Sequence, residues 1–245
     1  MVLNEREEYV LQAEKLLLES MAAPWNRRGH KLVDLGCGTG NFLELLWNTG
    51  FDVTGVDRSL EKIEQARTRF AKRVVDLHVH SIDALPFADR EFDYSVLWNV
   101  LEFISNPEEV LREAARVSAK GMLIGFYNSH SVYNMTSVVH SKAKKYPFKL
   151  LKSFNIDKPR DIRSSHCLSY PQVRKMVQAA TGRKVTRARS VLPGPPCCWK
   201  SSKFWNKVNT VLYPPHLGVF TAVRVDFVKT KPLTPIVLWR PGFEK

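Results

Sequence analysis

The chain has 245 residues, 44% of them hydrophobic, and a formal net charge of +13. This length suits one domain with insertions, and the apolar content is enough to fill a core of that size. No stretch approaches the ~18 consecutive apolar residues of a membrane span, and the residues after Met1 are charged where a signal peptide would be apolar. The sequence therefore argues against an integral membrane protein and predicts a cytoplasmic one.

The four cysteines include the adjacent pair Cys197 and Cys198, and they form neither a disulfide framework nor a C-x-x-C zinc pattern. We therefore expect reduced thiols and no bound metal. His166 and Cys167 together with that pair could bind a soft metal, but their spacing matches no standard site.

Charge is divided unevenly along the chain. Residues 1–126 contain 15 basic and 20 acidic residues, whereas residues 127–245 contain 22 basic and 4 acidic residues. Such asymmetry indicates an anionic partner for the second part, although a solvated basic surface would have the same composition.

The first predicted element is an amphipathic helix over residues 4–23, where Asn4 and Glu7 are spaced as a capping box. Its apolar positions recur at helical spacing at Val10, Leu17 and Met21. We expect this helix to pack on the core through that face.

A short apolar strand, a glycine-rich turn and a helix follow one another in residues 32–50. Alternate glycines at Gly36, Gly38 and Gly40 let the backbone approach a ligand without interference from Cβ atoms. The free N–H groups at the start of the next helix favour the same use, a nucleotide-type site. The spacing is G-x-G-x-G, whereas the dinucleotide fingerprint is G-x-G-x-x-G, and the Walker lysine is missing.

The second predicted strand covers residues 52–57 and ends in an acid, Asp57, which lies 21 residues beyond Gly36. Ser59 then serves as the N-cap of a helix over residues 60–72. A carboxylate at this strand end can accept both hydroxyl groups of a ribose.

Strands and helices continue to alternate downstream. Further strands are predicted over residues 74–80, 92–97, 122–127, 184–192 and 219–228. One helix begins with Asn106 as N-cap and Pro107 and runs to about Val117, and Lys120-Gly121 is expected to turn into the next strand. Another begins at a Ser169/Gln172 capping box, carries an apolar stripe at Val173, Met176, Val177 and Ala180, and ends at Gly182.

This alternation predicts a Rossmann-like, doubly wound α/β fold with a mostly parallel seven-stranded sheet and helices on both faces. We expect one domain over residues 1–245. It divides into a cofactor-binding half (26–126), a basic insertion (128–168), and a C-terminal helix and strands with a second insertion (169–245). Both insertions are expected on the active-site side.

Residues 32–126 resemble the class I S-adenosylmethionine-dependent methyltransferases, in particular the broad family that includes the ubiquinone and menaquinone biosynthesis enzymes. The resemblance is carried by the motifs Val33-Asp34-Leu35-Gly36-Cys37-Gly38-Thr39-Gly40, Gly55-Val56-Asp57, Leu85-Pro86-Phe87, Phe92-Asp93 through Leu101-Glu102, and Pro107 to Val117. It implies S-adenosylmethionine as the cofactor. It covers about half of the chain and does not specify the methyl acceptor.

The resemblance also implies roles for individual residues. Asp34 and the backbone of Gly36, Cys37, Gly38 and Gly40 would hold the methionine part of the cofactor, and Asp57 would bind the ribose. Trp98 and Asn99 would line the methyl group. The other residues expected at the cofactor are Arg58, Ser81, Ile82 and Asp83.

Two positions depart from the family pattern. Many relatives have an adenine-binding Asp where this chain has Ser81, and Asp83 follows two residues later, so the adenine contact is divided between these two residues. Relatives often have His after Leu-Glu, where this chain has Phe103, so a base inherited from that position is excluded.

Methyl transfer mainly requires that the nucleophile be held in line with the methyl carbon in a desolvated pocket, so a protein base is optional. If a base is used, His130 and His166 are the candidates, because both follow the fifth strand and precede the helix at residue 170. Either histidine could equally be a surface or structural residue.

Three functions fit the sequence. The first is methylation of a small or lipid-like, anionic acceptor; the second is methylation of nucleic acid or protein through the basic half. The third is a cofactor-binding partner protein that has lost catalysis.

Residues 199–213 bear on the choice between these functions. At helical spacing this segment separates Lys200, Lys203 and Lys207 from Trp205, Val208 and Leu212. That pattern fits either an ordinary amphipathic helix or peripheral contact with an anionic membrane.

Overall fold

The computed structural model describes residues 5–131, 168–193, 208 and 211–228. In this part of the chain one seven-stranded sheet has the order β3-β2-β1-β4-β5-β7-β6. The strands pair in parallel from β3 through β5, and β7 runs antiparallel to both β5 and β6. The predicted Rossmann-like, doubly wound fold is confirmed.

The strands are β1 (Lys31–Leu35), β2 (Asp52–Asp57), β3 (Asp76–Val79), β4 (Phe92–Trp98), β5 (Ser118–Tyr127), β6 (Arg187–Val191) and β7 (Phe220–Asp226). The helices are α1 (Glu5–Ala22), α2 (Asn41–Asn48), α3 (Leu60–Arg69), α4 (Pro107–Val117) and α7 (Tyr170–Thr181), with a 3-10 turn, η1 (Leu101–Phe103), after β4.

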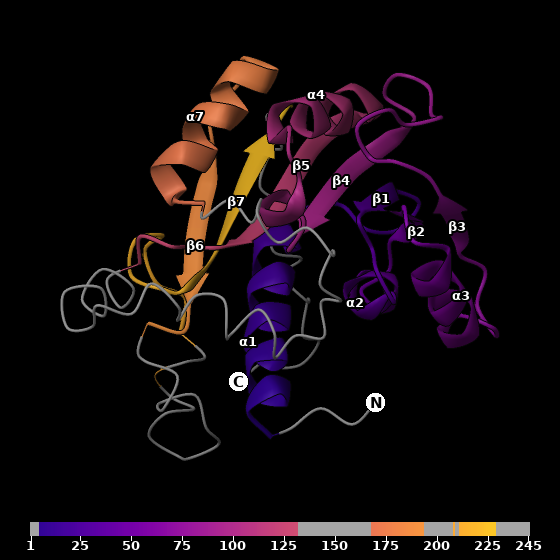
Figure 1. Cartoon of the computed structure of the whole chain (residues 1–245), viewed down its shortest axis with the longest axis horizontal. Helices are drawn as coiled ribbons and strands as arrows, with labels where there is room; N and C mark the ends of the chain where they lie inside the picture. Colours follow the sequence, from indigo (N-terminus) through magenta and orange to yellow (C-terminus); the bar gives the residue numbers. More distant parts are fainter. Residues whose placement is uncertain (1–4, 132–167, 194–207, 209–210, 229–245) are drawn as a thin grey trace, which may run out of the picture.

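Helices cover both faces of the sheet, with α1, α2 and α3 on one side and α4 and α7 on the other (Figure 1). Each strand supplies alternate side chains to the two faces. In β5, for example, Leu123 packs in the core beneath α1 and α2, whereas Met122 and Ile124 pack in the core beneath α4 and α7. The two buried cores hold the sheet rigid between them.

Chain order reverses at β1, which pairs with β2 on one side and with β4 on the other. In open α/β sheets, ligands bind beyond the carboxyl ends of the parallel strands at such a switch point. A ligand site is therefore expected at the segments that follow β1, β2 and β4.

Several predicted helix ends are confirmed. The Ser59 side chain accepts a hydrogen bond from the Lys62 N–H at the start of α3. At α7, Gln172 Oε1 accepts the Ser169 N–H at 2.9 Å, and Gly182 ends the helix at a φ of 67°. Local sequence was sufficient here because each cap involves residues only a few positions apart.

Asn106 is the N-cap residue of α4 and Pro107 begins the helix, as predicted, although the Asn106 side chain makes no capping hydrogen bond. One local prediction is wrong. Lys120-Gly121 is not a turn, because β5 begins at Ser118, directly after α4 ends. Gly121 instead allows close strand packing: a Cβ there would lie 2.8 Å from the Val225 carbonyl oxygen in β7.

Most of both predicted insertions lies outside the described residues. Of the basic insertion the structure describes residues 128–131 and Leu168, and of the segment 199–213 it describes Val208 and residues 211–213. Among the helices that are described, none is long and apolar enough to cross a bilayer.

Candidate functional site

The glycine loop after β1 is held in a backbone conformation that requires glycine. Gly36, Gly38 and Gly40 have φ values of 83°, 55° and 82°, in the left-handed region. The N–H groups of Gly36 and Cys37 both donate to the Val56 carbonyl oxygen, at 2.7 and 3.0 Å. The loop is therefore tied to the carboxyl end of β2.

The three glycines differ in what surrounds them. A Cβ on Gly36 would lie 2.4 Å from Val100 Cγ2, and one on Gly40 would lie 2.8 Å from Phe70 Cε2, so both glycines allow close packing inside the protein. A Cβ on Gly38 would meet no atom within 4 Å. Gly38 is thus the glycine whose outer side is open to an approaching ligand.

Asp57, at the end of β2, is hydrogen-bonded to the glycine loop. Its Oδ2 accepts the Gly38 N–H at 3.0 Å, and its Oδ1 accepts the Ser59 N–H at 2.9 Å. The residue is only 9% exposed. An ionised carboxylate has about four acceptor sites, so each oxygen can still accept a hydrogen bond from a hydroxyl group.

Asp34, in β1, is a buried carboxyl group, and no hydrogen bond to it is formed by the described part of the chain. Burial, together with the nearby Asp57, raises the pKa of Asp34 to about 7. A buried carboxyl group without a donor is costly, and it would be stabilised by a positively charged or N–H-bearing ligand.

Behind the loop, Arg69 at the end of α3 fastens the loop to the fold, and Arg73 just after α3 supports the same region. Arg69 Nε donates to the Thr39 carbonyl oxygen at 3.0 Å, and its guanidinium pairs with Glu44 of α2. Arg73 also pairs with Glu44 and stacks over the Trp47 ring. The loop is therefore supported on its inner side and open at Gly38.

Trp98 and Asn99 lie at the carboxyl end of β4, as expected. The Trp98 ring is buried against Gly125, Phe42 and Phe220, so its side chain belongs largely to the core. Asn99 is partly exposed and has a φ of 57°. Its side-chain Nδ2 donates to Glu14 Oε2 at 3.0 Å.

Glu14 and Glu102 are buried carboxyl groups, of which the sequence analysis missed Glu14, while Glu102 is a weaker base candidate than the two histidines. Burial raises the pKa of Glu14 to about 8, with Glu102 adding to the rise, and burial raises the pKa of Glu102 to about 7. Glu102 Oε1 accepts the Tyr127 N–H at 2.6 Å, whereas its Oε2 has no partner among the described residues. One signal was available for Glu14, because it falls on the apolar stripe of the predicted N-terminal helix.

The structure distributes the remaining predicted cofactor residues around the loop. The Cys37 side chain points into the core against Gly55, so only its backbone faces the loop, and burial raises the pKa of its thiol well above the usual range. Arg58 is exposed beside Asp57.

The predicted adenine contacts lie in the turn after β3. His80 donates its N–H to the Asp57 carbonyl oxygen at 3.1 Å, so this turn starts beside Asp57. Ser81 and Asp83 are exposed there, and Ile82 packs against the core beneath α4. No contact of the structure distinguishes Ser81 from Asp83 as the adenine partner.

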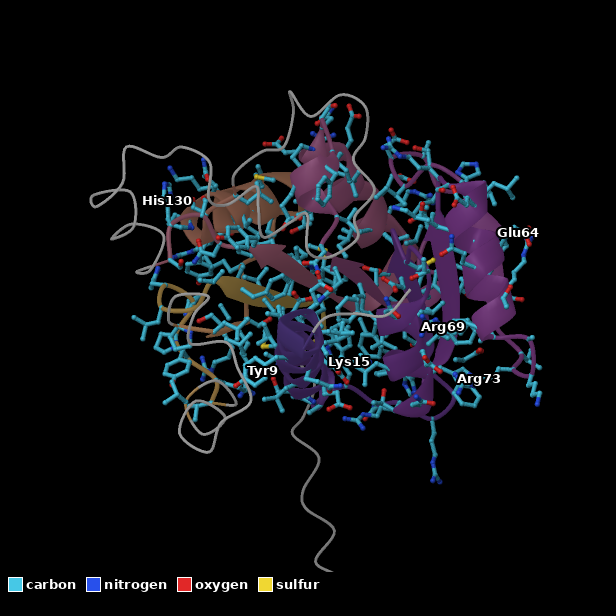
Figure 2. All side chains as sticks on the ribbon, turned by 60° about the horizontal axis from the view of Figure 1, so that its bottom comes forward. Tyr9, Lys15, Glu64, Arg69, Arg73 and His130 are labelled. Carbon is cyan, nitrogen blue, oxygen red and sulfur yellow. The ribbon has the colours of Figure 1, made fainter. Side chains whose placement is uncertain are left out.

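Of the two predicted bases, the described part of the chain contains His130 alone. His130 is exposed after β5, and Figure 2 shows it on the opposite side of the view from Arg69, which contacts the loop. His166 lies outside the described residues. Their catalytic roles remain predictions.

Among the described residues, no group of three or more His, Cys, Asp or Glu side chains is arranged to hold a metal ion. Cys167, Cys197 and Cys198, the thiols of the alternative metal interpretation, lie outside those residues.

Residues 33–125 match the sequence profile of the family described as "Methyltransferase domain". Over 99 residues the chain is 33% identical to a ubiquinone biosynthesis O-methyltransferase from Caulobacter sp., covering 39% of each protein. Over 104 residues it is 35% identical to a phosphatidylethanolamine N-methyltransferase from Cereibacter sphaeroides, covering 41% of this chain and 51% of that protein. The matched region thus spans about half or less of these relatives' own lengths.

The whole fold is shared more widely than the sequence. A solved structure of a possible histamine N-methyltransferase from Thermotoga maritima superposes with a TM-score of 0.63, at 22% identity, covering 91% of this chain and 95% of that one. At this identity the likeness establishes the fold and leaves the acceptor open. Residues 33–125 thus match a methyltransferase domain by sequence, and the described chain has the fold of the class I, S-adenosylmethionine-dependent methyltransferases.

Proposed function

We propose that this protein binds S-adenosylmethionine at the glycine loop and transfers its methyl group to a small or lipid-like, anionic acceptor. The observation that carries the proposal is the open side of Gly38, whose N–H donates to Asp57, in the loop that directly follows the strand of the buried Asp34. These features meet at the carboxyl ends of β1 and β2, where the fold binds ligands.

The residues fit the charges of the proposed cofactor. Asp57 retains acceptor sites for two ribose hydroxyl groups, and an ammonium group would supply Asp34 with a donor that the described residues do not provide. Glu14 and Glu102 add buried carboxyl groups on the side of β4 and β5. When bound, S-adenosylmethionine supplies an electrophilic methyl group on a positively charged sulfur, and such a cation suits a pocket lined with carboxyl groups.

The residues of this chain contribute binding and orientation. The glycine loop and Asp57 fix the nucleoside part, while strand pairing holds Asp34 and the Asn99 N–H bond to Gly125 holds Asn99. Proximity and orientation of this kind supply much of the rate of a methyl transfer.

The nature of the acceptor is inferred from the names of the relatives and from the charge of the chain. Two relatives are named for a quinone pathway and for a phospholipid, which favours a lipid-like acceptor. The anionic character rests on the excess of basic residues in residues 127–245, many of which lie outside the described residues. Peripheral membrane contact is part of the same proposal.

Two measurements test the proposed function. Isothermal titration calorimetry should detect binding of S-adenosylmethionine and S-adenosylhomocysteine but not of NAD, and a preference for NAD would contradict the assignment. The protein should then be incubated with methyl-labelled S-adenosylmethionine and, separately, with lipid extract, water-soluble metabolites, RNA and protein. Label in the lipid or metabolite fraction supports the proposal, and label in RNA or protein would favour the nucleic-acid or protein alternative. Cofactor binding without any transfer would favour a non-catalytic partner.

A further inference from the structure

We propose that Glu14 is a positioning residue of the methyl-transfer site, which orients the side-chain amide of Asn99 and so makes α1 part of that site. The inference rests on the proposed function, because it takes the carboxyl end of β4 as the place where the cofactor lies. It extends that function to a residue outside the matched methyltransferase domain, which begins at residue 33.

The contact joins two distant parts of the chain. Glu14 lies in α1, and its Oε2 accepts a hydrogen bond from Asn99 Nδ2 at 3.0 Å across a separation of 85 residues. Glu14 is 1% exposed and shares its helix face with Val10 and Leu17, which are core residues. A carboxyl group in that position has no route to solvent, and its hydrogen-bond partner among the described residues is the Asn99 amide.

The backbone of Asn99 is already fixed. Its φ of 57° is a left-handed conformation that few side chains other than Asn adopt readily, and its N–H donates to the Gly125 carbonyl oxygen at 2.9 Å. Only the side-chain torsions remain free, and the hydrogen bond to Glu14 sets them. Because Nδ2 faces Glu14, Oδ1 is the branch of the amide left for a ligand.

An oxygen acceptor at this point suits a group that donates a hydrogen bond or carries positive charge. With the amide turned the other way, an NH₂ group would face the same space and would repel a cation. Glu14 therefore selects which of the two arrangements Asn99 presents.

The surroundings of Glu14 indicate that this residue does not stabilise the folded protein. No ion pair to Glu14 is formed among the described residues, and the neighbouring charged group is another buried carboxyl, Glu102. The indole N–H of Trp98 also faces Glu14 but forms no hydrogen bond of good geometry. Two carboxyl groups buried without a cation cost stability, and strained or costly groups cluster at functional sites.

The experiment compares the affinity for S-adenosylhomocysteine, measured by calorimetry, with the midpoint of chemical unfolding. Glu14→Leu removes the acceptor and should raise Kd by about 10-fold, the equivalent of one oriented hydrogen bond, without lowering the unfolding midpoint. Glu14→Gln keeps an oxygen acceptor of the same reach and should restore Kd to within about 3-fold of the unaltered protein. Glu19→Leu is the matched control, because Glu19 lies in the same helix but is exposed.

A double variant separates positioning from simple packing of α1. In an Asn99→Ala background the amide is gone, so adding Glu14→Leu should change Kd by less than about 2-fold. If Glu14→Leu weakens binding equally in both backgrounds, Glu14 acts by packing and the inference is wrong. Unchanged affinity in Glu14→Leu would also overturn it.

Two further outcomes are decisive. If Glu14→Leu does not fold, Asn99→Ala alone must raise Kd, and an unchanged Kd in that variant overturns the inference. If the unaltered protein binds neither S-adenosylmethionine nor S-adenosylhomocysteine, the proposed function fails and this inference falls with it. A normal Kd for the unaltered protein with no effect of Glu14→Leu removes the inference alone.

Discussion

Asp57 and Gly38 are joined by a hydrogen bond of 3.0 Å from the Gly38 N–H to the Asp57 carboxylate. The same carboxylate accepts the Ser59 N–H at the start of α3. One side chain therefore fastens the loop after β1 to the segment after β2, and it still has acceptor sites for a ligand. The conformation of the glycine loop and the ribose contact that we propose thus depend on the same group.

The first prediction concerns this carboxylate. Asp57→Asn replaces one oxygen by an NH₂ group, which faces a backbone N–H and cannot accept a hydroxyl group. We expect the Kd for S-adenosylhomocysteine to rise by about 10- to 100-fold, the range of a charge-assisted hydrogen bond. The control is Asp52→Asn, at the exposed start of the same strand, and calorimetry measures both. Equal Kd values for the two variants would show that Asp57 does not contact the ligand.

The second prediction concerns the open side of the glycine loop. Gly38→Arg should abolish cofactor binding, because the new side chain projects into the space where we expect the ligand. Gly29→Arg is a matched control: Gly29 has a φ of 69°, close to the 55° of Gly38, and a Cβ on either residue meets no atom within 4 Å. Both substitutions should cost a similar ~1–2 kcal/mol of backbone strain. Loss of binding in both variants would trace the effect to folding rather than to the site.

The third prediction concerns pH. Burial raises the pKa values of Glu14 to about 8 and of Asp34 and Glu102 to about 7 from ordinary values near 4. Between these limits the folded protein binds more protons than the unfolded chain, so the free energy of unfolding should fall as the pH rises from 5 to 8. Each such carboxyl contributes at most about 1.4 kcal/mol per pH unit.

Urea unfolding of the cofactor-free protein at several pH values measures this dependence. Glu14→Gln should flatten the decline, because the amide does not ionise, whereas Glu19→Gln on the exposed face of α1 should leave it unchanged. Stability that is independent of pH over this window would show that the three carboxyl groups ionise as freely in the folded protein as in the unfolded chain.

The fourth prediction concerns residues 199–213, most of which lie outside the described residues. If this segment meets an anionic membrane, the protein should co-sediment with anionic vesicles at low salt and much less with neutral ones. Each basic residue near the surface adds about 1 kcal/mol. Combining Lys203→Glu with Trp205→Ala should abolish vesicle binding. The control combines Lys31→Glu with Trp47→Ala, which changes the same two kinds of side chain elsewhere in the protein and should leave vesicle binding intact. No vesicle binding at low salt would contradict the membrane interpretation, and tight RNA binding would favour the nucleic-acid alternative.

The amino-acid sequence by itself determined the fold class, the glycine loop and Asp57. These features depend on local patterns: alternating apolar strands and helices, glycines at every second position, and an acid at the end of the next strand. Residues close in the chain set such patterns, so they can be recognised without knowledge of the tertiary structure.

The remaining features of the candidate site could be recognised only in the tertiary structure. The contact of Glu14 with Asn99 spans 85 residues, and nothing in the sequence around either residue specifies the other. The open side of Gly38, the inward turn of the Cys37 side chain and the burial of Asp34 likewise depend on what packs against them. Burial and long-range pairing are properties of the folded chain. The buried carboxyl groups of the candidate site could therefore be identified only from the fold.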